Sequence, residues 1–312
     1  MTQVKAMGLA MLAAITLAGC DFDPVEWADS DRYREDFSYS YKLEPGGRLF
    51  LESFNGSVEV LGWDKDTVEV TGTKTAARQE VLNAMKIEAV SEPSYLRIRA
   101  IRPVERNCNC GAKFVLRVPK KITLERVETS NGSVRAENLN GPARLKTSNG
   151  SMRLWGMSGD VDGTTSNGTI ELTEFSGAAT LHTSNGKIRA EGVRGNLAAE
   201  TSNGSIDVNA EELDAGRMVK LSTSNSSITL SLAKFNSNPV TATTSNGSIN
   251  VRLPAAVSAE LRAGTSNGSI TTDFEVSTKT ISKNRLDGRI GNGGTPMELT
   301  TSNGSIRLLK RP

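Results

Sequence analysis

The tetrapeptide Thr-Ser-Asn-Gly recurs through this 312-residue chain and constrains its fold more than any other feature. After Thr129 the first four intervals are 18 residues long, and the later intervals are 22, 21, 21 and 36 residues. The last interval equals two units, which makes Gly291-Asn292-Gly293-Gly294 a candidate turn of a degenerate unit. A fixed period of this length predicts stacked repeats. The tetrapeptides, with one variant at Thr223, begin at Thr129, Thr147, Thr165, Thr183, Thr201, Thr223, Thr244, Thr265 and Thr301.

Within each unit, apolar and charged residues alternate. With the threonine counted as position 1, positions 6 and 8 are apolar and position 7 is charged, which predicts a half-buried strand. A glycine at position 13 precedes a second alternating segment, so each unit is expected to form one coil of two strands and two turns. Positions 6 to 8 are Val134-Arg135-Ala136, Met152-Arg153-Leu154, Ile170-Glu171-Leu172, Ile188-Arg189-Ala190 and Ile206-Asp207-Val208.

A single coil of this kind cannot bury its apolar face, so neighbouring coils must stack about 4.8 Å apart. The sequence therefore predicts an all-β fold: a right-handed β-solenoid of about nine coils, with regular repeats over residues 129–312. Residues 45–128 are expected to form an irregular N-terminal β cap and the first coils. We expect cap strands at Arg48–Ser53, Thr67–Thr71 (around the turn at Asn55-Gly56), Tyr95–Ile101 and Lys113–Val118, and a short helix within Ala76–Met85.

The Asn-Gly pair is expected at a corner, where glycine accepts a positive φ and asparagine can bond neighbouring backbone. Stacked asparagines can also bond one another along the axis. Period two places the Thr hydroxyl inward and the Ser hydroxyl outward, which favours a structural ladder over a Thr-Ser ligand-binding strip. Asn303 is expected at the end of this ladder. Its predicted members are Asn131, Asn149, Asn167, Asn185, Asn203, Asn225, Asn246, Asn267 and Asn303.

The N-terminus predicts a membrane address. Lys5 is the only charge before Asp21, Met7–Ala18 is almost wholly apolar, and Leu17-Ala18-Gly19-Cys20 resembles a bacterial lipobox. We expect residues 1–19 to be a signal peptide, Cys20 to carry the lipid, and residues 20–44 to be a tether with a first strand. The alternative is an ordinary signal peptide with an incidental cysteine. The expected location is the cell envelope, on the periplasmic face of either membrane or at the cell surface.

Charge gives no support to nucleic-acid binding. The chain has 37 basic and 35 acidic side chains, and removal of residues 1–19 takes away one lysine. A nearly neutral protein is not predicted to bind nucleic acid through its overall charge. Aromatic residues make up 5% of the chain, which fits a thin stacked structure better than one large core.

The chain is not expected to be an enzyme. His182 is the only histidine, no Gly-x-Ser-x-Gly motif is present, and outward carboxylates such as Glu171, Glu191 and Asp207 are not grouped in sequence. No cofactor or metal site is predicted. Trp155 is either lateral packing or a carbohydrate-stacking platform.

Cys108 and Cys110 are separated by one residue. In an oxidising compartment the pair is interpreted as a structural or incidental pair, with a disulfide, a redox pair or a metal ligand pair as alternatives. Metal binding would need further ligands, and the surrounding sequence offers no nearby His or Cys.

The repeated Thr-Ser-Asn-Gly-Ser-Ile units, together with the segments 53–60 and 114–119, resemble the bacterial family of putative adhesins, which are β-solenoid proteins. The resemblance implies a non-catalytic envelope lipoprotein, either an adhesin-like binder or a structural scaffold, and transfers no catalytic residue. Its expected partners are a membrane through the lipid, and polysaccharide, peptidoglycan or an envelope protein. The alternatives are a regulatory lipoprotein of envelope stress and a polysaccharide-processing β-helix enzyme.

Overall fold

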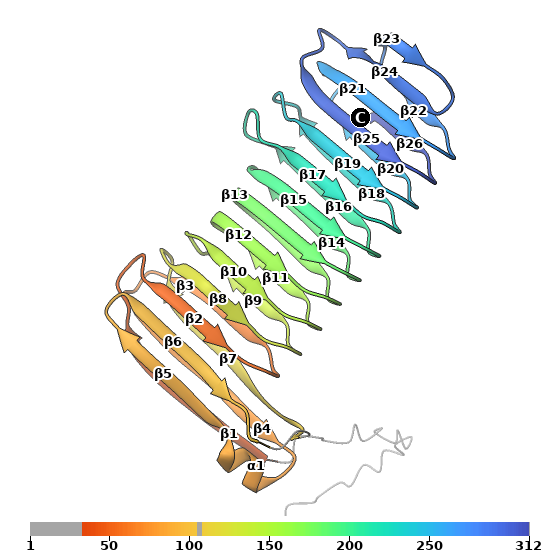
Figure 1. Ribbon diagram of the computed structural model, residues 1–312. Helices are drawn as coiled ribbons and strands as arrows, with labels where there is room; N and C mark the ends of the chain where they lie inside the picture. The colour runs from red at the N-terminus through yellow and green to blue at the C-terminus, as the bar shows by residue number, and fades with distance from the viewer. Residues whose placement is uncertain (1–32, 105–107, 312) are drawn as a thin grey trace, which may run out of the picture.

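The computed structural model describes residues 33–104 and 108–311. In this part of the chain, strands stack side by side into a long rod with two sheets facing each other (Figure 1). We call sheet A the one whose strands follow the Asn-Gly turns, and sheet B the one whose strands precede them. The predicted β-solenoid class is confirmed, while its handedness stays a prediction.

The regular coils pair in parallel and in register with their neighbours. Ile170 lies beside Ile188 and Glu171 beside Arg189, so equivalent positions form straight rows along the rod. The strands of these coils are β8 (Thr123–Glu128), β9 (Val134–Glu137), β10 (Ala143–Lys146), β11 (Met152–Trp155), β12 (Ser158–Thr164), β13 (Ile170–Thr183), β14 (Ile188–Val193), β15 (Asn196–Thr201), β16 (Ile206–Glu212), β17 (Val219–Ser222), β18 (Ile228–Lys234), β19 (Val240–Thr244) and β20 (Ile249–Leu253).

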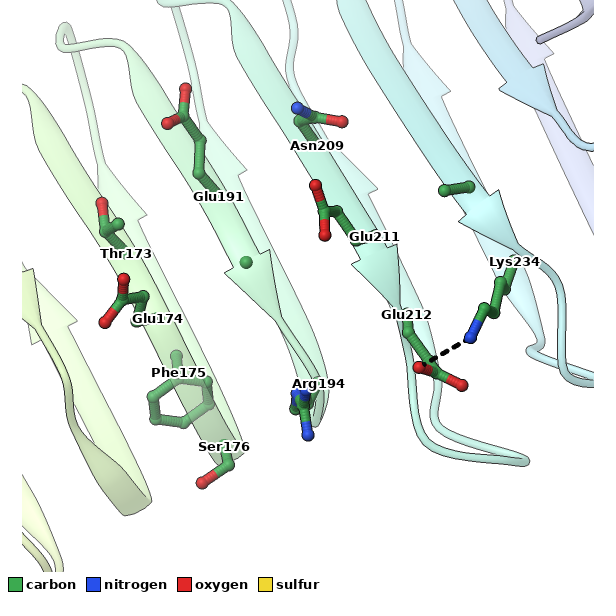
Figure 2. A pocket seen from close by; sticks show the side chains of 12 residues that line it. Thr173, Glu174, Phe175, Ser176, Glu191, Arg194, Asn209, Glu211, Glu212 and Lys234 are labelled. Atoms are coloured by element: carbon green, nitrogen blue, oxygen red, sulfur yellow. Dashed lines mark hydrogen bonds and ion pairs between the residues drawn. The ribbon is translucent and has the colours of Figure 1, made fainter.

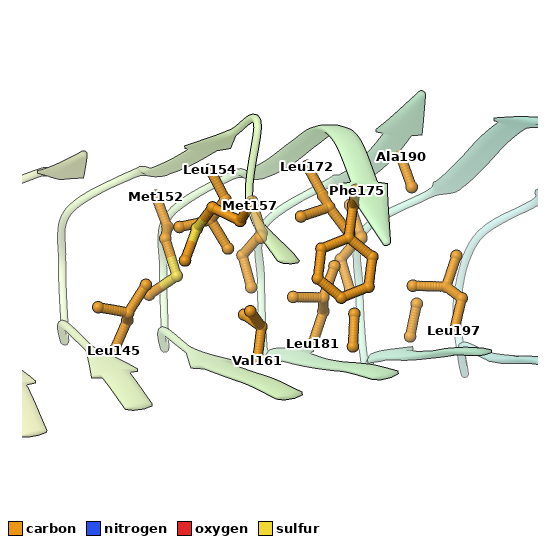
Figure 3. Packing of buried hydrophobic residues seen from close by; sticks show 14 of the residues in the cluster. Leu145, Met152, Leu154, Met157, Val161, Leu172, Phe175, Leu181, Ala190 and Leu197 are labelled. Carbon is orange, nitrogen blue, oxygen red and sulfur yellow. The ribbon is translucent and has the colours of Figure 1, made fainter. Parts of the chain in front are cut away.

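The core is the narrow space between the two sheets (Figure 3). The apolar residues of positions 6 and 8 are buried, as the alternation predicts, and they face the inward residues of sheet B such as Leu145 and Leu181. Met157 and Phe175, at position 11, fill the corner where one sheet passes into the other. Full burial of each such side chain stabilises the fold by about 1.5–3 kcal/mol, so the stability is spread evenly along the rod.

The N-terminal end departs from simple stacking. The coil β2–β3 lies inside the stack, because β6 and β7 pair with it on one side and β8 and β9 on the other. The two strands predicted around Asn55-Gly56 are confirmed as β2 and β4, but the strand that directly follows this turn, β3 from Val58, was not predicted. The elements are β1 (Tyr33–Lys42), β2 (Arg48–Glu52), β3 (Val58–Trp63), β4 (Thr67–Ala76), α1 (Gln79–Ala84), β5 (Lys86–Glu92), β6 (Tyr95–Ile101) and β7 (Cys110–Pro119).

The C-terminal end shows the same departure. The last coil of the chain, β25–β26, lies between the coil β19–β20 and the coil β21–β22. Asn303 is therefore an inner position, and its predicted place at the end of the ladder was wrong. The predicted degenerate coil around Gly291-Asn292-Gly293-Gly294 was also wrong, because antiparallel strands fill the interval between Thr265 and Thr301. The elements are β21 (Ala259–Thr265), β22 (Ile270–Thr272), β23 (Val276–Ile281), β24 (Arg285–Ile290), β25 (Thr295–Thr301) and β26 (Ile306–Lys310).

Antiparallel strands follow the outermost coils at both ends. At the N-terminal end, β4 and β1 extend sheet A and β5 extends sheet B. At the C-terminal end, β24 and β23 extend sheet B. These strands and α1 cover edges that would otherwise be free to pair with other chains. The helix lies inside the segment predicted to be helical, and its Val81 and Leu82 are buried.

The corner glycines are required for space. A Cβ atom on Gly186 would lie 1.8 Å from the carbonyl oxygen of Gly168, and the same contact recurs at Gly132, Gly150 and Gly204. The predicted reason, a positive φ, was wrong for these four glycines. It applies instead at position 13 to Gly141, Gly159 and Gly177, whose φ angles are 142°, 106° and 128°. Successive corners therefore approach too closely for a side chain.

The corner threonines form a buried row of hydrogen bonds between coils. Thr183 is fully buried, and its hydroxyl donates to the carbonyl oxygen of Gly168 (3.1 Å) and accepts from the amide of Gly186 (3.2 Å). Equivalent bonds from the hydroxyl to the preceding corner recur at Thr147, Thr165 and Thr201. Each threonine thus satisfies two backbone groups that water cannot reach.

Candidate binding surfaces

The ladder asparagines lie at an exposed corner of the rod. Each side-chain amide donates to the Oδ1 atom of the next asparagine toward the N-terminal end, at distances between 2.6 and 2.9 Å. The row also includes Asn55 of the looser tetrapeptide Ser53-Phe54-Asn55-Gly56, which was not among the predicted members of the ladder. In axial order the row is Asn55, Asn131, Asn149, Asn167, Asn185, Asn203, Asn225, Asn246, Asn303 and Asn267.

Because the asparagines are exposed, the Asn row and the Thr row have different roles at the corner. Asn167 and Asn185 are exposed while Thr165 and Thr183 are buried, so the Thr row satisfies the buried backbone. The Asn row is a polar stripe on the surface, with the Ser row beside it. The hydrogen bonds hold the Asn side chains in one orientation, which makes the stripe a rigid surface.

The outward face of sheet A carries a mixture of charges. Arg135 pairs with Glu59 (3.5 Å), and a hydrogen bond to Glu137 raises the pKa of Arg135 above its ordinary value. Arg153 pairs with Glu171 at 3.1 Å. Trp155 is 41% exposed in this face, beside Glu137 and Thr173 on the neighbouring strands. Exposed ion pairs of this kind contribute little to stability.

A groove of about 750 Å³ crosses the face where β13, β14, β16 and β18 approach the corner (Figure 2). Register places Thr173, Glu191 and Asn209 side by side on successive strands. Glu212 pairs with Lys234 at 3.0 Å. The charged residues that line the groove are Glu174, Glu191, Glu211, Glu212, Arg194 and Lys234.

Glu174 stands in an unusual backbone conformation inside this groove. Its φ is 52°, and the equivalent position of the other coils holds Asn138, Gly156 and Gly192, which also have positive φ. A glutamate in the left-handed region is strained by roughly 1–2 kcal/mol, and such strain concentrates at functional positions. The side chain is thereby placed on the exposed surface of the groove.

Of the residues considered for catalysis or metal binding, Glu191 lines the groove, whereas His182, Cys108 and Cys110 lie apart from it. His182 on sheet B lies 3.9 Å from Glu200, on the other sheet from the groove. Cys108 and Cys110 form a buried disulfide in the N-terminal cap. Among residues 33–104 and 108–311, no group of three or more His, Cys, Asp or Glu side chains is arranged to hold a metal ion.

Cys20, the signal segment and residues 20–32 of the tether lie outside the described residues, while residues 33–42 form strand β1. The one helix in the part of the chain that the structure describes is too short to cross a membrane.

The stacked coils and their Thr-Ser-Asn-Gly corners match a known family profile, Toastrack DUF4097, over residues 52–239 and 233–309. The chain belongs to this family. The two matched segments cover the coils from β3 to the last strand. Membership agrees with the resemblance to putative adhesins that the repeats indicate.

Solved structures give weaker likenesses. They include a putative cell adhesion protein from Clostridium sporogenes (11% identity, 89% of this chain and 100% of that chain, TM-score 0.24). A putative adhesin from Bacteroides fragilis is also similar, with 14% identity over 89% of this chain and 97% of that chain and a TM-score of 0.43. A putative lipid binding protein from Parabacteroides distasonis has 12% identity over 89% of this chain and 97% of that chain and a TM-score of 0.48. These scores do not decide the function. A comparison with curated proteins finds no match.

Proposed function

We propose that this member of the Toastrack DUF4097 family is a non-catalytic lipoprotein of the cell envelope that acts as an adhesin-like binding scaffold. Cys20 carries the lipid, and the rod presents its outward faces to a polysaccharide. The observation that carries the proposal is the groove on sheet A, where stacking in register aligns carboxylate, amide and hydroxyl groups across four strands.

The chemistry of the groove suits a neutral or partly cationic glycan. Carboxylate oxygens, the Asn209 amide and the Thr173 hydroxyl can hydrogen-bond sugar hydroxyl or amino groups. Four carboxylates against two cations disfavour an acidic polysaccharide. Peptidoglycan, whose glycan strands are long and repetitive, fits a groove that continues across successive coils.

The lipid anchor is tested by replacing Cys20 with Ser. The lipobox predicts that this variant is not cleaved before residue 20 and carries no acyl chains, so its intact mass should be that of the full 312-residue chain. The intact mass of the extracted protein is the measurement, because the uncleaved apolar segment Met7–Ala18 can itself hold the variant in the detergent phase. If the Cys20→Ser variant has the same cleaved and acylated mass as the wild type, the lipid anchor is wrong.

Binding is tested by co-sedimentation of purified residues 21–312 with peptidoglycan sacculi and with neutral and acidic polysaccharides. We expect the double variant Glu191→Lys and Glu211→Lys to lose most of its binding, because it reverses charge at the groove centre. Glu275→Lys, an exposed carboxylate outside the groove, is the matched control and should bind like the wild type. Equal binding by both variants would show that the groove is not the binding site. Release of new sugar ends by the wild type would show that the protein is an enzyme.

A further inference from the structure

The N-terminal end of the rod is lined with tyrosines. Strand β1 is the outermost strand of sheet A in the described part of the chain, and its odd-numbered residues face the core side of the sheet. Phe37, Tyr39 and Tyr41 accordingly lie beside Gly72, Val70 and Val68 of β4, and the two valines are buried. Beyond β1 no further described strand covers these rings, so the core opens to the outside here.

The aromatic rings are in contact and only partly buried. Phe37 is 8% exposed and packs against Phe114, with ring centroids 5.3 Å apart. Tyr39 is 41% exposed and stacks on Phe37 at 5.8 Å, and the Tyr41 ring follows at 6.4 Å. Partial burial, and then the neighbouring Tyr39, raise the pKa of Tyr41.

Helix α1 closes only one side of this end. Its Val81 and Leu82 are buried, and the buried Lys74 ammonium reaches Glu35 (2.8 Å) and the carbonyl oxygen of Met85 (3.3 Å). Tyr33 is 36% exposed at the start of β1, near Ala76 and this helix. The three tyrosines thus form an amphipathic rim around the half-open end.

Tyrosine is confined to this end of the molecule. The chain has four tyrosines, at positions 33, 39, 41 and 95, and none in the regular coils. Tyrosine and tryptophan collect where an apolar phase meets water, because the ring is apolar and its tip is polar. Nothing in the stacking of the coils requires tyrosine rather than leucine at these positions.

The same end is the one that a lipid on Cys20 would hold near the bilayer. Residues 21–32 are the only connection between Cys20 and β1, and twelve residues with their flanking bonds span at most roughly 45 Å. From β1 to β22 sheet A has thirteen strands, so the far end lies about 60 Å away at 4.8 Å per strand.

We propose that the N-terminal end of the rod rests on the membrane, with Tyr33, Tyr39 and Tyr41 in the lipid headgroup region. The inference rests on the proposed lipid anchor and adds that the rod makes direct contact with the lipid surface. The outermost strands of this end carry exposed charges of both signs, among them Arg34, Asp36 and Lys42 on β1 and Glu88 on β5. The contact is therefore aromatic, and it does not depend on anionic lipid.

The test uses the full acylated protein in phosphatidylcholine vesicles. A spin label is placed at Ser40→Cys, an exposed position on β1 between Tyr39 and Tyr41, or at Thr180→Cys in mid-rod as the control. Attachment to vesicles should lower the accessibility of the label at position 40 to an aqueous nickel chelate and leave position 180 unchanged. The same loss is expected with and without phosphatidylglycerol.

Two further variants test whether the tyrosines cause the loss of accessibility. Tyr39→Ser with Tyr41→Ser should restore aqueous accessibility at position 40 while the protein still sediments with the vesicles. The single change Tyr39→Ser, at an exposed position, should restore part of it. Equal accessibility at positions 40 and 180 in attached protein would overturn the contact and leave the anchor standing. Dipolar broadening between labels at position 40 would show a second copy there instead. Protein that does not sediment would overturn the anchor, and the contact with it.

Discussion

Replacing Thr183 with Val should lower the free energy of unfolding by about 2–6 kcal/mol, although the two side chains have nearly the same shape. Valine has no hydroxyl, so the buried carbonyl of Gly168 and the amide of Gly186 both lose their partner. Each unpaired buried group costs about 1–3 kcal/mol. Urea unfolding followed by circular dichroism measures the change as a lower midpoint.

Two neighbouring substitutions are the controls for Thr183→Val. Thr183→Ser keeps the hydroxyl and should lose much less stability. Ser184→Ala changes the adjacent residue, which is less buried, and should lie within about 0.5 kcal/mol of the wild type. A Val variant as stable as the Ser184→Ala variant would show that the Thr row does not hold the coils together.

Replacing Gly186 with Ala should destabilise the rod by about 3 kcal/mol or more, through a steric mechanism. The new Cβ atom would lie 1.8 Å from the carbonyl oxygen of Gly168, so the two coils must move apart. That movement also lengthens the hydrogen bond from the Thr183 hydroxyl to the carbonyl oxygen of Gly168, which is 3.1 Å long. The midpoint of urea unfolding and the protection of corner amides from hydrogen exchange should both fall.

Gly264→Ala is the matched control, because a Cβ atom there meets nothing within 4 Å. Its effect should be small. One coil already holds a side chain at the corner, Ser226, so a single coil can adjust, and Ser226→Ala should cost less than Gly186→Ala. If Gly186→Ala and Gly264→Ala have the same small effect, the close approach of the corners is not a constraint on the sequence.

The local structure could be predicted from the sequence because it depends on a short period. Alternation over Ile170-Glu171-Leu172 decides which side chains face the core. The same rule places the Thr side chain of each corner inward and the Ser side chain outward. The reason for the corner glycine could not be found this way. Its constraint is a contact between coils, Gly186 against Gly168, which appears only when the distance between neighbouring corners is known.

The axial order of the coils also could not be predicted from the sequence. A repeat period shows that units are equivalent and not which units are neighbours, so Asn303 was placed last. The groove was missed for a related reason. Glu174, Glu191 and Glu211 come from different coils, and their meeting depends on register and on the positive φ of Glu174. The one available signal was the asparagine or glycine at position 10 of neighbouring units, which marks a bend at that position.

The continuous asparagine ladder and the placement of the antiparallel strands at the two ends both depend on the axial order of the coils, and paired cysteines test this order directly. Adjacent rungs lie about 4.8 Å apart, within reach of a disulfide, whereas positions two rungs apart exceed the roughly 7 Å limit. In the structure Asn303 is the neighbour of both Asn246 and Asn267, which lie on opposite sides of it. The protein with Asn246→Cys and Asn303→Cys should therefore form a disulfide rapidly under mild oxidation, and the protein with Asn246→Cys and Asn267→Cys should not. Rapid crosslinking of the second pair and none of the first would show that the coils stack in chain order and would contradict the architecture.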